Sequence, residues 1–156
     1  MGNRSFVDSN KTYDTATVSR VPLFKQYNTI TAQQKEHEDS TSGIVLQNCS
    51  IKASQHLSNV TTYFGRPWGK FSRTMIMKRY IDNLIDPRGW VESFVVSHRP
   101  YYLEYKNREP GVVTKGRMTW ASVTTDPNIA LNFTIRNFIN GDKWIPANIP
   151  HYLGLS

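Results

Sequence analysis

The chain has 156 residues, of which 38% are hydrophobic and 12% aromatic, so it can build one domain with its own core and need not be disordered. Its net charge of +7 indicates attraction to a polyanion, without choosing among nucleic acid, an anionic membrane and an acidic polysaccharide. No segment approaches the roughly 20 apolar residues of a membrane span, and the N-terminus lacks the pattern of a signal peptide. We therefore expect no membrane partner.

The first half of the chain is predicted to hold short strands. Residues 1–27 alternate only weakly and are expected to form short strands and loops. The β-branched run 29–32 predicts a strand, and an acidic turn is expected around 36–39. Residues 43–53 predict a further strand, in which Ile51 and Ala53 share one face.

The second half continues this pattern and adds one helix. Strands are predicted at 73–81 and 101–105, with a turn at 86–89, where Pro and Gly occur together. A short helix is predicted over 126–133, with Asp126 as N-cap and Pro127 in the first helical position. Strands without intervening helices indicate an all-β protein, and a sandwich, a propeller and a solenoid all remain open on this pattern.

Seven sequence blocks occur in an order and spacing that resemble the second half of plant pectin methylesterases. Gly65-Arg66-Pro67-Trp68 alone would be a weak signal, because Arg-Pro-Trp also fits a surface turn with an anchoring tryptophan. The seven blocks together cover most of residues 28–146, and residues 1–27 match poorly. The blocks are 28–33, 43–49, 65–68, 80–90, 102–107, 116–120 and 138–146.

The resemblance implies a right-handed parallel β-helix, of which residues 1–156 would form the C-terminal coils of the catalytic domain, with a short C-terminal helix and loops. Each coil of such a solenoid buries inward side chains against its neighbours. The expected core residues are Ile30, Val45, Ile51, Met75 and Met77.

The resemblance also implies the chemistry. In the family, one aspartate attacks the methyl ester of a galacturonate unit, a second acts as general acid and base, and glutamines stabilise the oxyanion, with no metal or cofactor. Arg66 matches an arginine that pairs with the nucleophile and places the substrate, since its planar guanidinium binds a carboxylate through two hydrogen bonds. Trp68 matches a tryptophan that packs against a sugar ring.

No catalytic residue is identified in this chain. The family's two aspartates lie in upstream segments that do not occur here, and residues 1–6 would follow directly after the second. Asp82, Asp86 and Glu104 fall in blocks expected to be scaffold, while Asp8 and Asp14 match no motif. The histidines at 37, 56, 98 and 151 lack the spacing of metal ligands. Residues 91–100 depart from the family pattern, so the shape of the cleft is expected to differ there.

The sequence suggests three candidate functions. The first is hydrolysis of the methyl esters of homogalacturonan in plant cell-wall modification, impaired here by the missing aspartates. The alternative is an inactive remnant or pseudogene-like product that still binds pectin. The third is a nucleic-acid-binding β protein, which no RNP, KH or zinc-knuckle pattern supports, so we expect no nucleic-acid partner.

Two further expectations concern the whole molecule. A solenoid lacking its first coils exposes the apolar face that they cover, so self-association through that end is expected. The resemblance implies an extracellular location in the cell wall, although this chain carries no signal peptide of its own.

Overall fold

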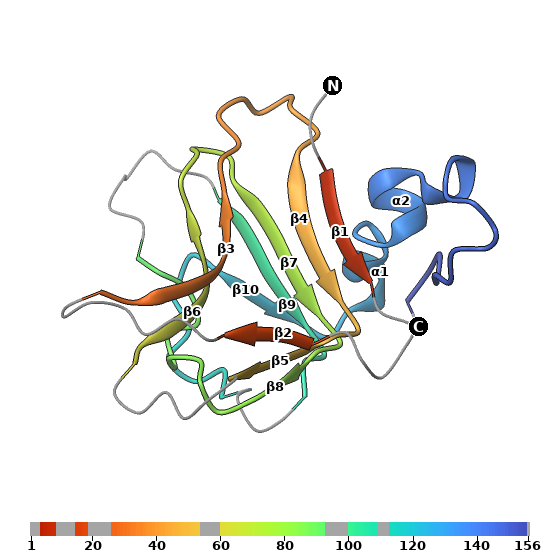
Figure 1. Cartoon of the computed structure of the whole chain (residues 1–156). Coiled ribbons are helices and arrows are strands. Elements are labelled where there is room, and N and C mark those ends of the chain that lie inside the picture. Colours follow the sequence, from red (N-terminus) through yellow and green to blue (C-terminus); the bar gives the residue numbers. More distant parts are fainter. Residues whose placement is uncertain are drawn as a thin grey trace.

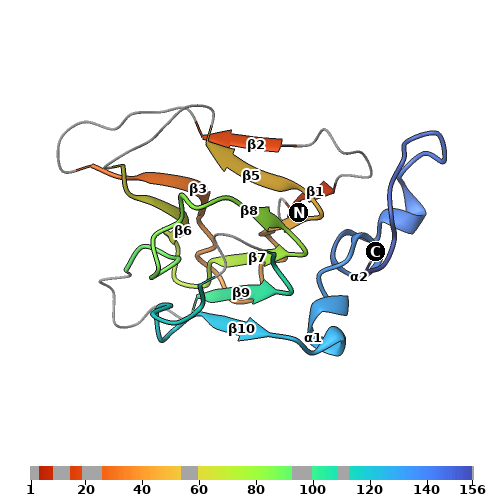
Figure 2. The same cartoon turned by 90° about the horizontal axis from the view of Figure 1, so that it is seen from below.

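The computed structural model describes residues 4–8, 15–18, 26–53, 60–92, 100–108 and 113–155. Its strands form three parallel sheets around one core, and the helices lie together at one side of them (Figures 1 and 2). From β1 to β8, successive strands join the three sheets in turn, which is the architecture of a parallel β-helix. The predicted fold is therefore confirmed.

We call the three sheets A, B and C. Sheet A has the strand order β1 (Arg4–Asp8), β4 (Gly43–Gln47), β7 (Arg73–Met77), β9 (Tyr101–Tyr105) and β10 (Ser122–Thr124). Sheet B has β2 (Thr15–Val18), β5 (Ser50–Ala53) and β8 (Tyr80–Ile81). Sheet C has β3 (Asn28–Gln33) and β6 (Thr62–Pro67). Neighbours in every sheet are parallel.

Sharp corners join sheet A to sheet B, and they correct two predicted strands. Residues 43–53 form β4 and β5 rather than one strand, because Asn48 adopts a left-handed backbone with φ of 53°. Residues 73–81 likewise divide into β7 and β8 at Lys78, also with φ of 53°. The predicted strands at 29–32 and 101–105 lie within β3 and β9, and β1 and β2 fall in the weakly patterned segment 1–27.

The core is built from side chains that stack from coil to coil. Val45 pairs with Met75, and Met75 with Leu103, and these three side chains are buried in one cluster. Ile51 and Met77 are also fully buried, as predicted, whereas Ile30 is only partly buried at the margin of the core. Inward residues of neighbouring coils thus exclude water from each other, as a solenoid requires.

The C-terminal segment covers one side of this core. The predicted helix is α1 (Pro127–Leu131), and the Asp126 side chain accepts a hydrogen bond from the Asn128 N–H at 2.8 Å. A second helix, α2 (Ile135–Ile139), and a 3₁₀ turn (Gly141–Lys143) follow and were not predicted. Phe133 and Phe138 pack into the cluster of Val45 and Met75, so this segment closes the core. In the part of the chain that the structure describes, no helix has the length and apolar character to cross a membrane.

Candidate substrate-binding site

Arg66 and Trp68 lie at the end of β6 in sheet C. Arg66 pairs with Ala32 and Pro67 with Gln33 of the parallel strand β3. The Arg66 side chain is exposed, and Trp68, directly after the strand, is 59% exposed. The two residues expected to bind substrate therefore reach solvent from neighbouring positions, and Arg66 and Pro67 end a strand instead of forming a surface turn.

Gly65 permits this strand to approach its neighbours. A Cβ at this position would lie 2.1 Å from the hydroxyl oxygen of Thr31, which already donates a hydrogen bond to the Phe64 carbonyl at 2.9 Å. It would also lie 3.3 Å from the ring of Trp90, whose segment is bonded to Gly65 through the Val91 N–H at 3.0 Å. Only glycine fits here, and the missing side chain lets β6, which carries Arg66, lie close to β3 and Trp90.

The Trp68 loop is fixed to the end of β3. The Trp68 N–H donates to the Gln33 carbonyl at 3.0 Å, and the Ser72 hydroxyl donates to the same oxygen. The Gln33 side chain accepts from the Arg73 N–H at 3.0 Å. A Cβ on Gly69 would meet the Lys35 backbone at 2.5 Å. The indole is thus presented to solvent by a loop whose backbone is held in place.

The partner of Arg66 in the described structure is a tyrosine. Its Nη1 donates to the Tyr27 hydroxyl at 3.2 Å. Tyr27 directly precedes β3, so this hydrogen bond links the end of β6 to the residue before the first residue of β3. The ring of Tyr27 meets the ring of Tyr63 edge-on, with centroids 5.4 Å apart. Arg66 is therefore held beside an aromatic pair that joins β6 to the start of β3.

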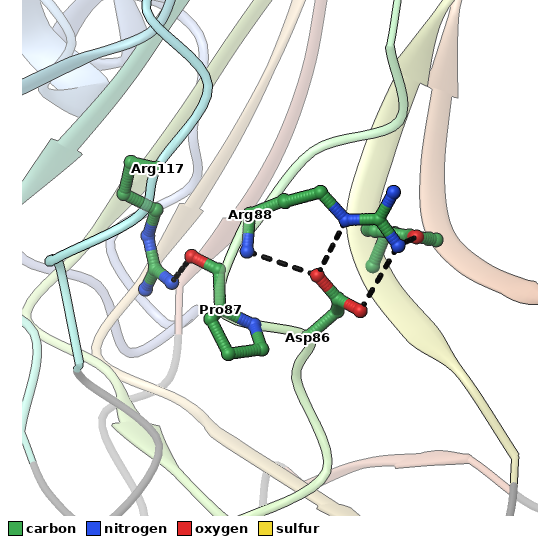
Figure 3. A network of polar contacts seen from close by, with 5 residues as sticks. Asp86, Pro87, Arg88 and Arg117 are labelled. Atoms are coloured by element: carbon green, nitrogen blue, oxygen red, sulfur yellow. Dashed lines mark hydrogen bonds and ion pairs between the residues drawn. The ribbon is translucent and has the colours of Figure 1, made fainter.

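A polar network continues from Tyr63 to the turn at 86–89. Arg88 donates to Asp86, with Nε 2.9 Å from Oδ1 (Figure 3), and it also donates to the Tyr63 hydroxyl. The Gly89 N–H closes the predicted turn onto the Asp86 carbonyl at 2.8 Å. Hydrogen bonding from Arg88 lowers the pKa of Asp86. Burial raises the pKa of Tyr63, and the negative charge of Asp86 raises it further, while the positive charge of Arg88 partly offsets this increase. The network orders the aromatic pair next to Arg66.

The carboxylates of the scaffold blocks are engaged elsewhere. Asp86 binds Arg88, and Glu104 is buried with Arg117, with Oε1 and Oε2 at 2.7 and 3.1 Å from Nε and Nη2. Asp82 accepts from the Asn83 N–H at 2.8 Å. Arg66 contacts none of these side chains, whose hydrogen bonds match the scaffold role expected for them.

Several residues that match no site motif in the sequence are not described by the structure. Asp14, His56 and His98 lie outside the described residues, as do most of residues 91–100 and the side chain of Asp8. Within the described ranges, no three His, Cys, Asp or Glu side chains gather in a way that could hold a metal ion.

Comparison with known proteins places this geometry in a family. The pectinesterase family model matches residues 12–142. The chain belongs to the pectinesterase family. It is 41% identical over 145 residues to a probable pectinesterase/pectinesterase inhibitor of Arabidopsis thaliana and 41% identical over 138 residues to pectinesterase 2 of Citrus sinensis. Its fold matches pectin methylesterase from carrot with a TM-score of 0.84 at 37% identity over 90% of this chain.

The chain spans only part of these pectinesterases. It covers 28% of the Arabidopsis protein, 27% of the Citrus protein and 47% of the carrot chain. The resemblance recognised from the sequence blocks is therefore confirmed at the level of family and fold.

Three residues near Arg66 were not found from the sequence: Tyr27, Tyr63 and Arg88. They lie in different coils and in a turn, and become neighbours only through the pairing of β3 with β6 and the closing of the turn. Arg88 falls in the predicted turn at 86–89, but the turn signal gives no partner for its side chain, and Tyr27 and Tyr63 lie just outside the matched blocks 28–33 and 65–68.

Proposed function

We propose that this chain supplies the Arg66–Trp68 side of a pectin-binding cleft, and that the protein acts on the methyl esters of homogalacturonan. Support comes from an exposed guanidinium and an exposed indole fixed next to each other at the end of β6. The indole gives a flat apolar face for a pyranose ring, and the guanidinium gives paired donors for a carboxylate. Family membership supports pectin as the class of substrate.

Ester hydrolysis needs a carboxylate nucleophile and a proton-transfer partner in addition to these two residues. Among the described residues, the scaffold carboxylates hold structural hydrogen bonds and Arg66 is bonded to Tyr27. We therefore propose that the aspartates come from coils that stack on the β3 side of sheet C, where β3 is the edge strand among the described residues. The 156-residue chain alone then binds pectin as an inactive fragment.

Methanol release from methyl-esterified pectin tests this division of roles. We expect the isolated chain to release methanol at the background rate, because removing a nucleophile costs about 10⁴- to 10⁶-fold in rate. The matched control is the Arg66→Ala variant, which should give the same background. Enzymatic release that disappears in Arg66→Ala would show that this chain carries its own nucleophile and would contradict the proposal.

Self-association is proposed for the same edge. β3 has a partner strand, β6, on one side only in the described structure, and an edge strand exposes unpaired N–H and C=O groups. We expect the isolated chain to form dimers or larger species whose light-scattering mass rises with concentration. A monodisperse monomer that melts cooperatively across the same concentrations would contradict this.

An extracellular location in the plant cell wall is also proposed, on the basis of the family and of the net charge of +7. A basic protein is retained by acidic polysaccharide through interactions that salt screens. The protein should then be recovered from the wall fraction of plant tissue by high salt. Recovery in the intracellular fraction alone would refute the location.

A further inference from the structure

The corner between sheets A and B repeats from coil to coil with one backbone conformation. Asn48, Lys78 and Lys106 occupy this corner in three successive coils, with φ of 53°, 53° and 44°. The Asn48 N–H donates to the Met77 carbonyl at 3.2 Å, and the Lys78 N–H donates to the Tyr105 carbonyl at 2.8 Å. These hydrogen bonds tie each corner to the next coil, so the three side chains form a ladder along the solenoid axis.

Lysine is an unusual residue for these positions. The left-handed region favours Gly and Asn, and a lysine there stores backbone strain. Asn48 is the residue type that the conformation favours, yet the next two coils carry Lys78 and Lys106. The backbones of two lysines are thereby placed one strand spacing apart, about 4.8 Å along the axis.

An open cavity of about 720 Å³ lies against this ladder. From the far end of the chain, Tyr152 contributes to its wall. The segment after Tyr152 is fixed by hydrogen bonds from Gln47 Nε2 to the Gly154 carbonyl and from the Arg136 N–H to the Leu153 carbonyl, both at 3.1 Å. The cavity is lined by Asn48, Lys78, Lys106, Asn107, Arg108 and Tyr152.

The three cations of the cavity have no carboxylate partner in the described structure, where the ion pairs are Asp86–Arg88 and Glu104–Arg117. The charge continues onto the outer face of sheet B. Arg108 pairs with Tyr80, which is 40% exposed, and Lys52 Nζ lies 5.6 Å from the centre of the Tyr80 ring. An exposed aromatic ring thus stands among cations from consecutive coils.

We propose that this corner is a second binding site, specific for a run of carboxylated sugars such as de-esterified homogalacturonate. Cations at regular axial spacing suit a linear polymer with one carboxylate per sugar, and Tyr80 offers a ring face for a pyranose. The corner stands at the end of sheet B that adjoins sheet A, and sheet C lies beyond the opposite end of sheet B (Figure 1). This site is therefore separate from Arg66 and Trp68. The choice of galacturonate rests on the proposed function.

Calorimetric titration with a fully de-esterified oligogalacturonate tests the site. In the variant Lys78→Asn/Lys106→Asn, both charges are removed and asparagine suits the left-handed backbone, so the fold should be kept. We expect the Kd for the de-esterified oligomer to rise about tenfold, as two exposed ionic contacts allow. The control Lys115→Asn/Lys143→Asn removes the same charge from exposed positions outside the cavity and should bind as the wild type does.

A methyl-esterified oligomer separates this inference from the proposed function. Its binding should be lost in Arg66→Ala/Trp68→Ala and unchanged in the corner variant. Weaker binding of the de-esterified oligomer by the corner variant supports the second site. If Arg66→Ala/Trp68→Ala binds the esterified oligomer as the wild type does, that result refutes the proposed function and leaves the second site standing. A corner variant within about twofold of wild type overturns the second site, whatever the Arg66 variant does. If the wild-type protein binds single-stranded DNA or polyglutamate as tightly as, or more tightly than, the de-esterified oligomer, the specificity of the second site for sugars is overturned.

Discussion

Replacing Arg117 with Met should reduce the free energy of unfolding by about 3–5 kcal/mol, the cost of leaving a buried charge without its partner. The side chains of Arg117 and Glu104 are 5% and 2% exposed and are joined by two hydrogen bonds. Arg117 Nη1 also donates to the Pro87 carbonyl at 2.9 Å, as Figure 3 shows, and its guanidinium carbon lies 5.2 Å from the centre of the Phe64 ring. One side chain therefore connects β9, the turn at 86–89 and the core.

The matched control is Arg88→Met, which breaks the ion pair with Asp86. Arg88 is 54% exposed, so its loss should cost about 1 kcal/mol or less. The double variant Glu104→Leu/Arg117→Met should recover much of the stability lost in Arg117→Met, because no unpaired charge remains inside. Urea unfolding of the four proteins measures these differences. If Arg117→Met costs no more than Arg88→Met, the buried pair does not join these elements as described.

Replacing Arg79 with Met should increase the free energy of unfolding by about 1–4 kcal/mol, in contrast to the decrease expected for Arg117→Met. Arg79 lies between β7 and β8 and is fully buried, and among the described residues none of its three guanidinium nitrogens has a hydrogen-bond partner. Burial lowers the pKa of Arg79 to about 9. Methionine fills a similar volume without a charge to desolvate, and denaturant unfolding at pH 7 measures the gain.

The pH dependence of this gain follows from the lowered pKa. Below about pH 9 the guanidinium is charged in both the folded and the unfolded state, so the full cost of burying the charge is present. Above that pH the folded state loses its proton first, the unfolded state binds more protons, and wild-type stability rises relative to Arg79→Met. The difference between the two proteins should therefore shrink between pH 8 and pH 10.5. A destabilised Arg79→Met, or a difference that grows with pH, would contradict this.

Local signals explain which elements were predicted correctly. The turn at 86–89 and the start of α1 were found because Asp-Pro sequences act within a few residues, through a fixed φ and a side-chain cap. The corners at Asn48 and Lys78 were missed because their left-handed backbone is imposed by hydrogen bonds to the next coil. Strand β6 was not predicted because Gly65 and Pro67 argue against a strand, and only the close packing of β3, β6 and Trp90 requires that glycine.

The site divides in the same way. Arg66 and Trp68 were predicted from a sequence motif. The contacts among Tyr27, Tyr63 and Arg88 depend on the pairing of β3 with β6 and on the side-chain geometry of the turn, which no sequence pattern predicts. The Lys78 and Lys106 ladder was equally hidden, since the two residues are 28 positions apart and each is an ordinary cation in its own segment.

The central claim is that Arg66 and Trp68 form a pectin-binding surface, and the most direct test is the Kd of Trp68→Ala for a methyl-esterified homogalacturonan oligomer. Trp68 is 59% exposed, so its removal should leave the melting temperature unchanged and raise the Kd about tenfold or more. The control Trp144→Ala removes an indole that is 61% exposed in the C-terminal segment and should bind as the wild type does. A Kd for Trp68→Ala equal to that of the wild type would contradict the claim.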